Sequence, residues 1–105
     1  MSDADPGKPA PGLPRLPGDV VAYDRTREFD QDMIPAGLRR RHATKAGVWA
    51  RIVVVEGALR YRVLEPEAAE WVLTPEIHGV AAPAMPHEVE PLGGVRFYVE
   101  FLRGA

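Results

Sequence analysis

With 105 residues the chain has the length of a single domain, and because it contains no cysteine a disulfide framework and a thiolate metal site are excluded. Its formal net charge of −2 at pH 7 argues against a dedicated nucleic-acid binder, since such domains carry an excess of basic residues. The first residues lack the basic and apolar regions of a signal peptide, and no apolar run approaches the roughly 18 residues that span a membrane. We therefore expect a cytoplasmic protein that binds neither nucleic acid nor membranes.

Proline dominates the start of the chain, where five of the eleven prolines fall within residues 1–17. Proline fixes φ and removes a backbone donor, so we expect this segment to join neither a β-ladder nor a helix interior. We predict a disordered proline-rich tail over residues 1–17, with a proline-rich ligand for a partner module as the alternative because PxxP spacing occurs there. A single β-domain is predicted over residues 18–105.

The remainder of the chain is typical of short β-strands separated by glycine and proline. Residues 48–55 are rich in β-branched side chains, Glu56 and Gly57 are predicted to form a turn, and residues 58–64 alternate with the period of a half-buried strand. Further strands are predicted at residues 20–23, 70–74 and 80–82. One window, residues 65–71, allows at most one or two helical turns.

The last two predicted strands, residues 87–90 and 95–102, form a hairpin around residues 92–94. Many short strands joined by such turns indicate an all-β protein, built as an antiparallel sandwich or a small barrel.

The register of this hairpin depends on the length of its loop. A two-residue loop would place His87 opposite Glu100, whereas a three-residue loop would place His87 opposite Val99. We favour the second register because it gathers one apolar face, and a slip of one residue would turn every side chain to the other side. This predicted apolar face consists of Val89, Phe97, Val99 and Phe101.

Motifs of several enzyme classes are missing from the sequence. It contains no glycine-rich phosphate loop, no G-x-S-x-G nucleophile elbow and no H-E-x-x-H pair. The one serine, Ser2, lies in the predicted tail, which excludes serine nucleophilic catalysis.

Three histidines, His42, His78 and His87, are the natural metal ligands of a chain without cysteine. His42 precedes the strong strand and His87 opens a late one, so an antiparallel barrel can bring the two together across its interior. The alternative is that each histidine is a surface or hydrogen-bonded residue. As a third ligand we consider Glu100, which faces His87 in one hairpin register, or His78, and the alternative for both is exposure to solvent.

Basic side chains suggest a second kind of binding. The run Arg39-Arg40-Arg41 could hold an anion, or it could be a solvated loop. Arg51 shares a face with Trp49 on a regular strand, and an arginine beside an indole could line a pocket for a planar or anionic ligand. The alternative is amphipathic packing, with the arginine stem lying on the sheet.

Two stretches together resemble a known family: PAGLRRRHATKAGVWARIVVVEGALRY and, after it, TPEIHGVAAPAMPHEVEPLGGVRFYVEF. They are similar to small cupin-like proteins that include the YeaR-like proteins and the N-terminal domain of some TehB tellurite-resistance methyltransferases. The resemblance covers about residues 19–103 and rests on H-x-T-K-x-G-x-W, E-G-x-L-x-Y and P-H-x-V-E-P in combination. It implies a double-stranded β-helix, the cupin barrel, built from two antiparallel sheets.

The resemblance also implies a divalent metal inside the barrel, since cupins hold one with histidines and a carboxylate. His42 matches the first histidine of the first cupin motif, and His87 matches the histidine of the second. Thr44 stands where the first motif has its other histidine, and Trp49 or Ala50 stands where it has its glutamate. Because two of the usual four ligands are missing, we expect zinc or nickel, with iron or manganese as alternatives.

From these features we predict a small metal-binding module for a small anionic or oxygen-containing ligand, associated with tellurite or oxidative stress. Catalysis is left open and not favoured. The alternatives are a metal-dependent dioxygenase or isomerase, and a metal-free dimerisation scaffold. A homodimer is expected because the sandwich has edges to cover. The methyltransferase activity of the TehB relatives is assigned to a separate domain, since nothing in these 105 residues resembles an S-adenosylmethionine site.

Overall fold

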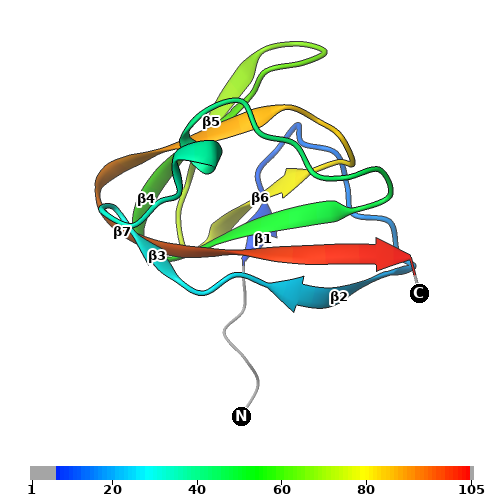
Figure 1. The fold of residues 1–105 in the computed structure, drawn as a ribbon, viewed down its shortest axis with the longest axis horizontal. Coiled ribbons are helices and arrows are strands. Elements are labelled where there is room, and N and C mark those ends of the chain that lie inside the picture. The colour runs from blue at the N-terminus through cyan, green and yellow to red at the C-terminus, as the bar shows by residue number, and fades with distance from the viewer. Residues whose placement is uncertain (1–6, 105) are drawn as a thin grey trace.

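The computed structural model describes residues 7–104, and nearly all of its regular secondary structure is β-strand (Figure 1). In chain order the elements are β1 (Lys8–Pro9), β2 (Val20–Arg25), β3 (Phe29–Asp30), the short 3-10 helix η1 (Ala36–Arg39), β4 (Trp49–Val63), β5 (Ala69–Leu73), β6 (Ile77–Ala81) and β7 (His87–Gly104). The predicted all-β fold is confirmed, and its arrangement is a cupin-like β-sandwich. Within residues 7–104 no helix has the length and apolar character that crossing a bilayer requires.

Two long strands organise the sandwich. β4 has 15 residues and β7 has 18, and the two pair antiparallel along nearly their whole lengths. Around one half of this pair the strand order is β1-β6-β4-β7-β2, while β5 pairs with the other half of β4. Both long strands bend midway, so the two halves lie as facing layers with the core between them (Figure 1).

The bend replaces the turn and the hairpin that the sequence predicts. β4 continues through Glu56 and Gly57, and residues 92–94 lie inside β7. His87 is therefore paired with Val63 of β4, so both predicted hairpin registers are wrong. The reason is that glycine allows a backbone conformation that other residues rarely adopt. Gly57 has a φ of +84°, and the ladder between β4 and β7 shifts register on both sides of it. A bulge of this kind bends a strand without ending it.

The alternation of side chains along these strands is predicted correctly. Val89, Phe97 and Val99 are buried in the core, and Phe101 packs against it. Their partners across the ladder face the same way, as Ile52 does opposite Val99. The predicted apolar face is therefore confirmed, because the period of two depends only on the local backbone and not on where the strand ends.

The proline-rich segment lies against the sheet from Gly7 onward. Lys8 and Pro9 form β1, which pairs in parallel with β6, so the prediction that this segment joins no ladder is wrong at these two residues. The ladder uses the amides on either side of the proline: Lys8 N donates to Glu76 O and Ala10 N donates to His78 O, each at 2.9 Å. Pro9 therefore sits where no donor is needed. Residues 1–6 of the predicted tail lie outside the described residues, and the boundary at residue 18 stays a prediction.

Three short elements differ from the sequence prediction. Residues 65–71 form no helix, and β5 begins within this window at Ala69. β3 and η1 are not predicted, because two and four residues are too few to show a period. The strand predicted at residues 70–74 is confirmed as β5.

Replacing Gly57 with alanine should destabilise the fold strongly. An added Cβ would clash with the carbonyl oxygen of Gly94 and would also force a side chain into the left-handed region. We expect a loss of about 3 kcal/mol in the free energy of unfolding, measured by urea denaturation. The control is Gly94→Ala, where an added Cβ meets no heavy atom within 4 Å. Its change should stay within about 0.5 kcal/mol, and equal losses in the two variants would contradict this account of the bend.

Candidate functional site

The structure brings His42 and His87 together. The amide of each donates to the carbonyl oxygen of the other, both at 2.8 Å, as an isolated antiparallel bridge. Their rings lie with centroids 5.4 Å apart and planes 87° to one another. The loop before β4 is in this way fixed to the first residue of β7, and the two histidines that the sequence pairs are neighbours.

His87 is the buried member of the pair, with 3% of its surface exposed. Its Nδ1 lies 2.9 Å from the carbonyl oxygen of Met85, and its ring lies 5.6 Å from that of Tyr61. Burial lowers the pKa of His87 below its ordinary value; the Met85 carbonyl opposes this shift, and positive charge on His42 adds to it. A neutral imidazole therefore faces the core.

Tyr61 closes the inner side of this pair. Its hydroxyl donates to the carbonyl oxygen of Val80 at 3.0 Å, and burial raises the pKa of the hydroxyl well above its usual value. The alternation over residues 58–64 predicts a half-buried strand but does not place Tyr61 beside a histidine. Knowledge of the pairing of β4 with β7 would have been needed to predict this contact. The pairing puts Tyr61 opposite Val89, which lies two residues after His87 on the same face of β7.

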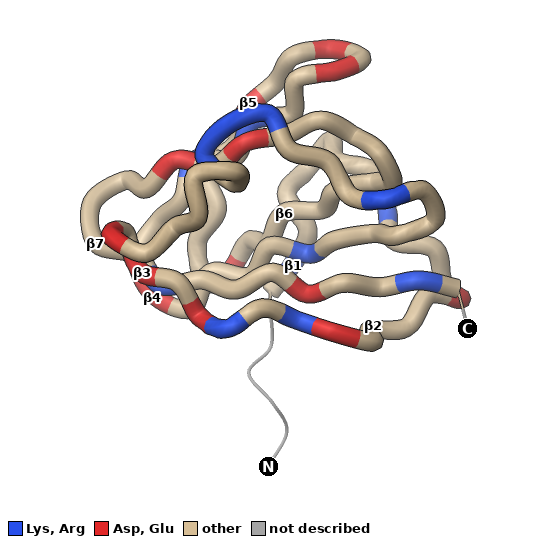
Figure 2. Tube along the Cα trace, viewed as in Figure 1, with Lys and Arg blue, Asp and Glu red and all other residues tan. Residues whose placement is uncertain are grey.

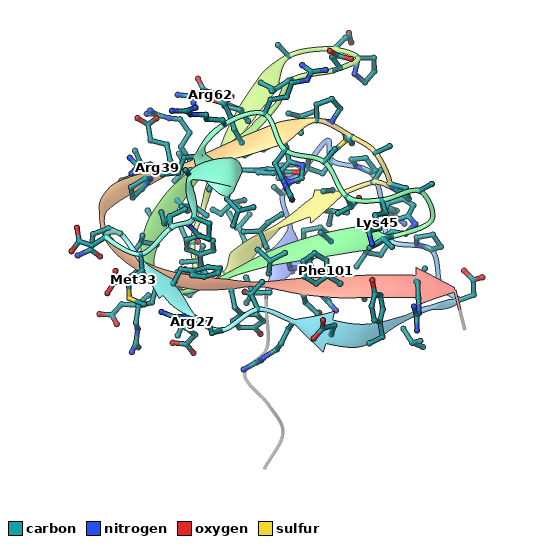
Figure 3. The ribbon with its side chains drawn as sticks, viewed as in Figure 1. Arg27, Met33, Arg39, Lys45, Arg62 and Phe101 are labelled. Carbon is teal, nitrogen blue, oxygen red and sulfur yellow. The ribbon has the colours of Figure 1, made fainter. Side chains whose placement is uncertain are left out.

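A pocket of about 310 Å³, here called the mouth pocket, opens beside His42. It is lined by Tyr23, Asp24, His42, Ala43, Thr44, Lys45, Val48 and Phe101. Figure 3 labels Lys45, from the loop that precedes β4, and Phe101, from β7. The Thr44 hydroxyl donates to the carbonyl oxygen of Val48 at 2.7 Å, which holds that loop in a tight turn. Most of these residues lie in loops or at an edge, where the sequence shows no period that would have predicted them.

Glu100 is not brought to the histidine pair. It lies on the opposite face of β7 from Val99, and its Oε1 accepts from Nη2 of Arg51 at 2.7 Å and from Nε at 2.9 Å. Trp49 shares this outer face with Arg51, as the sequence predicts, but neither residue lines the mouth pocket. The predicted ligand pocket at these two residues is thus on the other side of the sheet from His87.

His78 also lies on the outer side of the sheet. The next residue, Gly79, faces the core, where an added Cβ would contact Leu73, Tyr61 and Ile52. His78 is 5% exposed and lines a cleft of about 360 Å³ under the N-terminal segment. The other residues of that cleft are Pro9, Arg15, Leu16, Arg51 and Val80. His78 is therefore separated from His42 and His87 by the sheet.

The residues around the histidine pair do not fit the metal centre that the cupin resemblance implies. Protein metal centres usually draw on three or four protein ligands. Among residues 7–104 no group of three or more histidine, aspartate or glutamate side chains is placed to hold a metal ion. A divalent metal at His42 and His87 stays a prediction.

The model of the TehB-like domain family matches residues 24–99. The chain belongs to this family. A curated relative is the probable S-adenosyl-L-methionine-dependent methyltransferase TehB of Haemophilus influenzae (strain ATCC 51907), which is 28% identical over 81 residues. The same protein from strain 10810 is 27% identical over 81 residues. In both comparisons the matched residues are 73% of this chain but 28% of the relative, so the TehB-like domain spans less than a third of those proteins.

Solved structures support the same division. The crystal structure of TehB from Haemophilus influenzae superposes with a TM-score of 0.76 at 26% identity, over 83% of this chain and 32% of that chain. A crystal structure of a protein from Escherichia coli (strain K12) superposes with a TM-score of 0.78 at 22% identity, over 89% of this chain and 99% of that chain. At that identity the second match shows the fold alone. The TehB-like fold thus occurs both as part of a larger chain and as nearly a whole one.

These relatives correct the function predicted from the sequence. We predicted a metal-binding module for a small anionic or oxygen-containing ligand, and this is wrong: the family is the TehB-like domain, and its relatives are named S-adenosyl-L-methionine-dependent methyltransferases. The prediction relied on residue types that suit a metal, but two histidines side by side do not establish one. The TehB part of the predicted resemblance is confirmed.

The lowered pKa of His87 predicts how stability depends on pH. The unfolded chain has an ordinary histidine, with a pKa of 6.5, so below that pH it binds more protons than the folded protein. The free energy of unfolding should therefore decrease as the pH falls below 6.5. In urea titrations the variant His87→Gln should lose less stability on acidification than the wild type.

The control is His42→Gln, which keeps the buried ring of His87 and should keep most of the decrease. In NMR titrations the His87 ring protons should shift with a midpoint below 6.5. An unchanged pH dependence in His87→Gln would contradict this interpretation.

Proposed function

We propose that this chain is a non-catalytic β-domain that works with a unit carrying out S-adenosyl-L-methionine-dependent methyl transfer. The observation that carries the proposal is the coverage of the relative: the match includes 73% of this chain but 28% of the probable methyltransferase. Most of that protein lies outside the TehB-like domain. The methyl-transfer unit, supplied by the same polypeptide or by a second one, would correspond to that remainder.

The fold is consistent with a methyl donor site that lies in the partner unit and not in this chain. Nucleotide-like cofactors are commonly held at the ends of strands in open α/β sheets, where a glycine-rich loop leads into a helix. Within residues 7–104 the one helix is η1, of four residues, and the strands form a β-sandwich, not an open α/β sheet. The chain therefore has a scaffold suited to contact and orientation, and the partner unit would contribute the methyl donor site.

We place the functional end of the domain at the mouth pocket. It is lined by His42, the partner of the buried His87, and it combines the apolar side chains of Val48 and Phe101 with the polar groups of His42 and Lys45. A surface of this kind can receive a group from the partner unit or close over the acceptor of the methyl group. The backbone of His42 is held by its two hydrogen bonds to the backbone of His87.

Several finer predictions belong with this proposal. They are the likeness to YeaR-like proteins, a cytoplasmic location and a homodimer. The proposed function depends on none of these.

The chain should bind the methyltransferase unit of Haemophilus influenzae TehB when that unit is prepared without its own TehB-like domain. We expect a one-to-one complex in sedimentation velocity experiments at about 10 µM of each protein, the range of transient interfaces. Full-length TehB is the control and should not bind the chain, because its own domain covers the same surface. Two independent sedimenting species at that concentration would contradict the proposal.

A further inference from the structure

Positive charge is concentrated in one stretch of the chain. Between Asp32 and Glu56 there is no acidic residue, although the chain as a whole has a net charge of −2. Four basic side chains of this stretch, Arg39, Arg40, Arg41 and Lys45, are exposed on the segment that leads from η1 to β4. We call residues 39–48 the basic loop, and Figure 2 shows its blue segments along one side of the molecule. The rest of the sequence is correspondingly acidic.

The basic loop has a fixed conformation. The bridge between His42 and His87 anchors it to β7, and Ala84 N donates to the carbonyl oxygen of Thr44 at 3.2 Å. Val48 N donates to Lys45 O at 3.1 Å, and Gly47 takes a φ of +80° in the turn between them. A loop held in this way loses little conformational entropy when it binds a partner.

Most of its charge is not neutralised within the domain. Arg41 pairs with Glu65, but both side chains are more than half exposed, so the pair contributes little. Among the described residues no carboxylate lies within 4.0 Å of the charged groups of Arg39, Arg40 or Lys45. The second layer of the sandwich is different, because there Arg60 and Arg62 share ion pairs with Glu70, Glu88 and Glu90.

Apolar side chains lie beside the basic loop. Tyr23 is 43% exposed and lines the mouth pocket, and Val21 on the same strand is 50% exposed. Lys45 and His42 line the other side of that pocket. An apolar centre with a charged rim is the usual composition of a protein–protein interface.

We propose that the basic loop docks onto an acidic surface of the methyltransferase unit, so that the mouth pocket faces that unit. This inference rests on the proposed function and names its contact surface. A protein surface is favoured over a nucleic acid because the chain has a pI near 5.9, and four cations on a short loop fall well short of a basic stripe along a backbone. Tyr23 and Val21 also suit a protein partner better than a phosphate backbone.

The test compares two variants that remove the same number of positive charges. The loop variant is Arg39→Ala, Arg40→Ala and Lys45→Ala combined; the control variant is Lys8→Ala, Arg15→Ala and Arg27→Ala combined. All six side chains are exposed, so both variants should fold, which circular dichroism checks. The probe is the methyltransferase unit of Haemophilus influenzae TehB, and fluorescence anisotropy measures its dissociation constant.

At about 50 mM salt the loop variant should bind about tenfold more weakly than the wild type, while the control variant stays within about twofold. Raising the salt to about 500 mM should remove most of the difference in affinity between the loop variant and the wild type, because salt screens the charged contacts. Equal affinities of the loop and control variants would overturn the docking surface and leave the proposed function standing. Failure of the wild type to bind the unit would overturn both.

A duplex DNA oligonucleotide distinguishes the other class of partner. We expect the wild type to bind it no more tightly than the control variant does, and far more weakly than it binds the methyltransferase unit. Tight binding of the duplex that is lost in the loop variant would overturn the choice of a protein partner.

Discussion

The close approach of Gly57 to Gly94 is the constraint on which the rest of the structure depends. A side chain at Gly57 would occupy the space of the Gly94 carbonyl oxygen, so β4 and β7 can approach this closely only if residue 57 has no side chain. Because both strands continue through the bend, each contributes to both layers of the sandwich. The continuous strand β7 begins at His87, which pairs with His42. The two layers that enclose the core therefore depend on this contact.

Charged side chains on the outer faces of the sandwich are paired with one another, whereas most of those on the basic loop are not. The outer face of one layer balances Arg60 and Arg62 against three glutamates, and the outer face of the other pairs Arg51 with Glu100. The interior holds a histidine that burial keeps neutral. Among the described residues most cations of the basic loop lack such compensation, since only Arg41 pairs with a carboxylate, and the loop is therefore the surface expected to meet another protein.

Local features of the fold follow from the sequence, and long-range ones do not. The alternation in Val89, Phe97 and Val99 predicts the core face because side-chain direction depends on the backbone alone. The glycines at residues 57, 93 and 94 predict turns, yet the structure uses Gly57 and Gly93 in bulges, and only the pairing of two distant strands distinguishes those outcomes. Proline at residue 9 argues against a ladder, yet the ladder needs only the amides of Lys8 and Ala10 beside it. The sequence predicts that His42 and His87 meet, but that no third ligand joins them among residues 7–104 depends on which face Glu100 and His78 occupy.

The central claim is that this TehB-like domain takes part in methyl transfer without binding the methyl donor. Isothermal titration calorimetry with S-adenosyl-L-methionine tests it most directly, with full-length Haemophilus influenzae TehB titrated under the same conditions as the reference. The account predicts saturable binding by TehB and no saturable binding by this chain alone. Saturable binding of S-adenosyl-L-methionine by the isolated chain would contradict it.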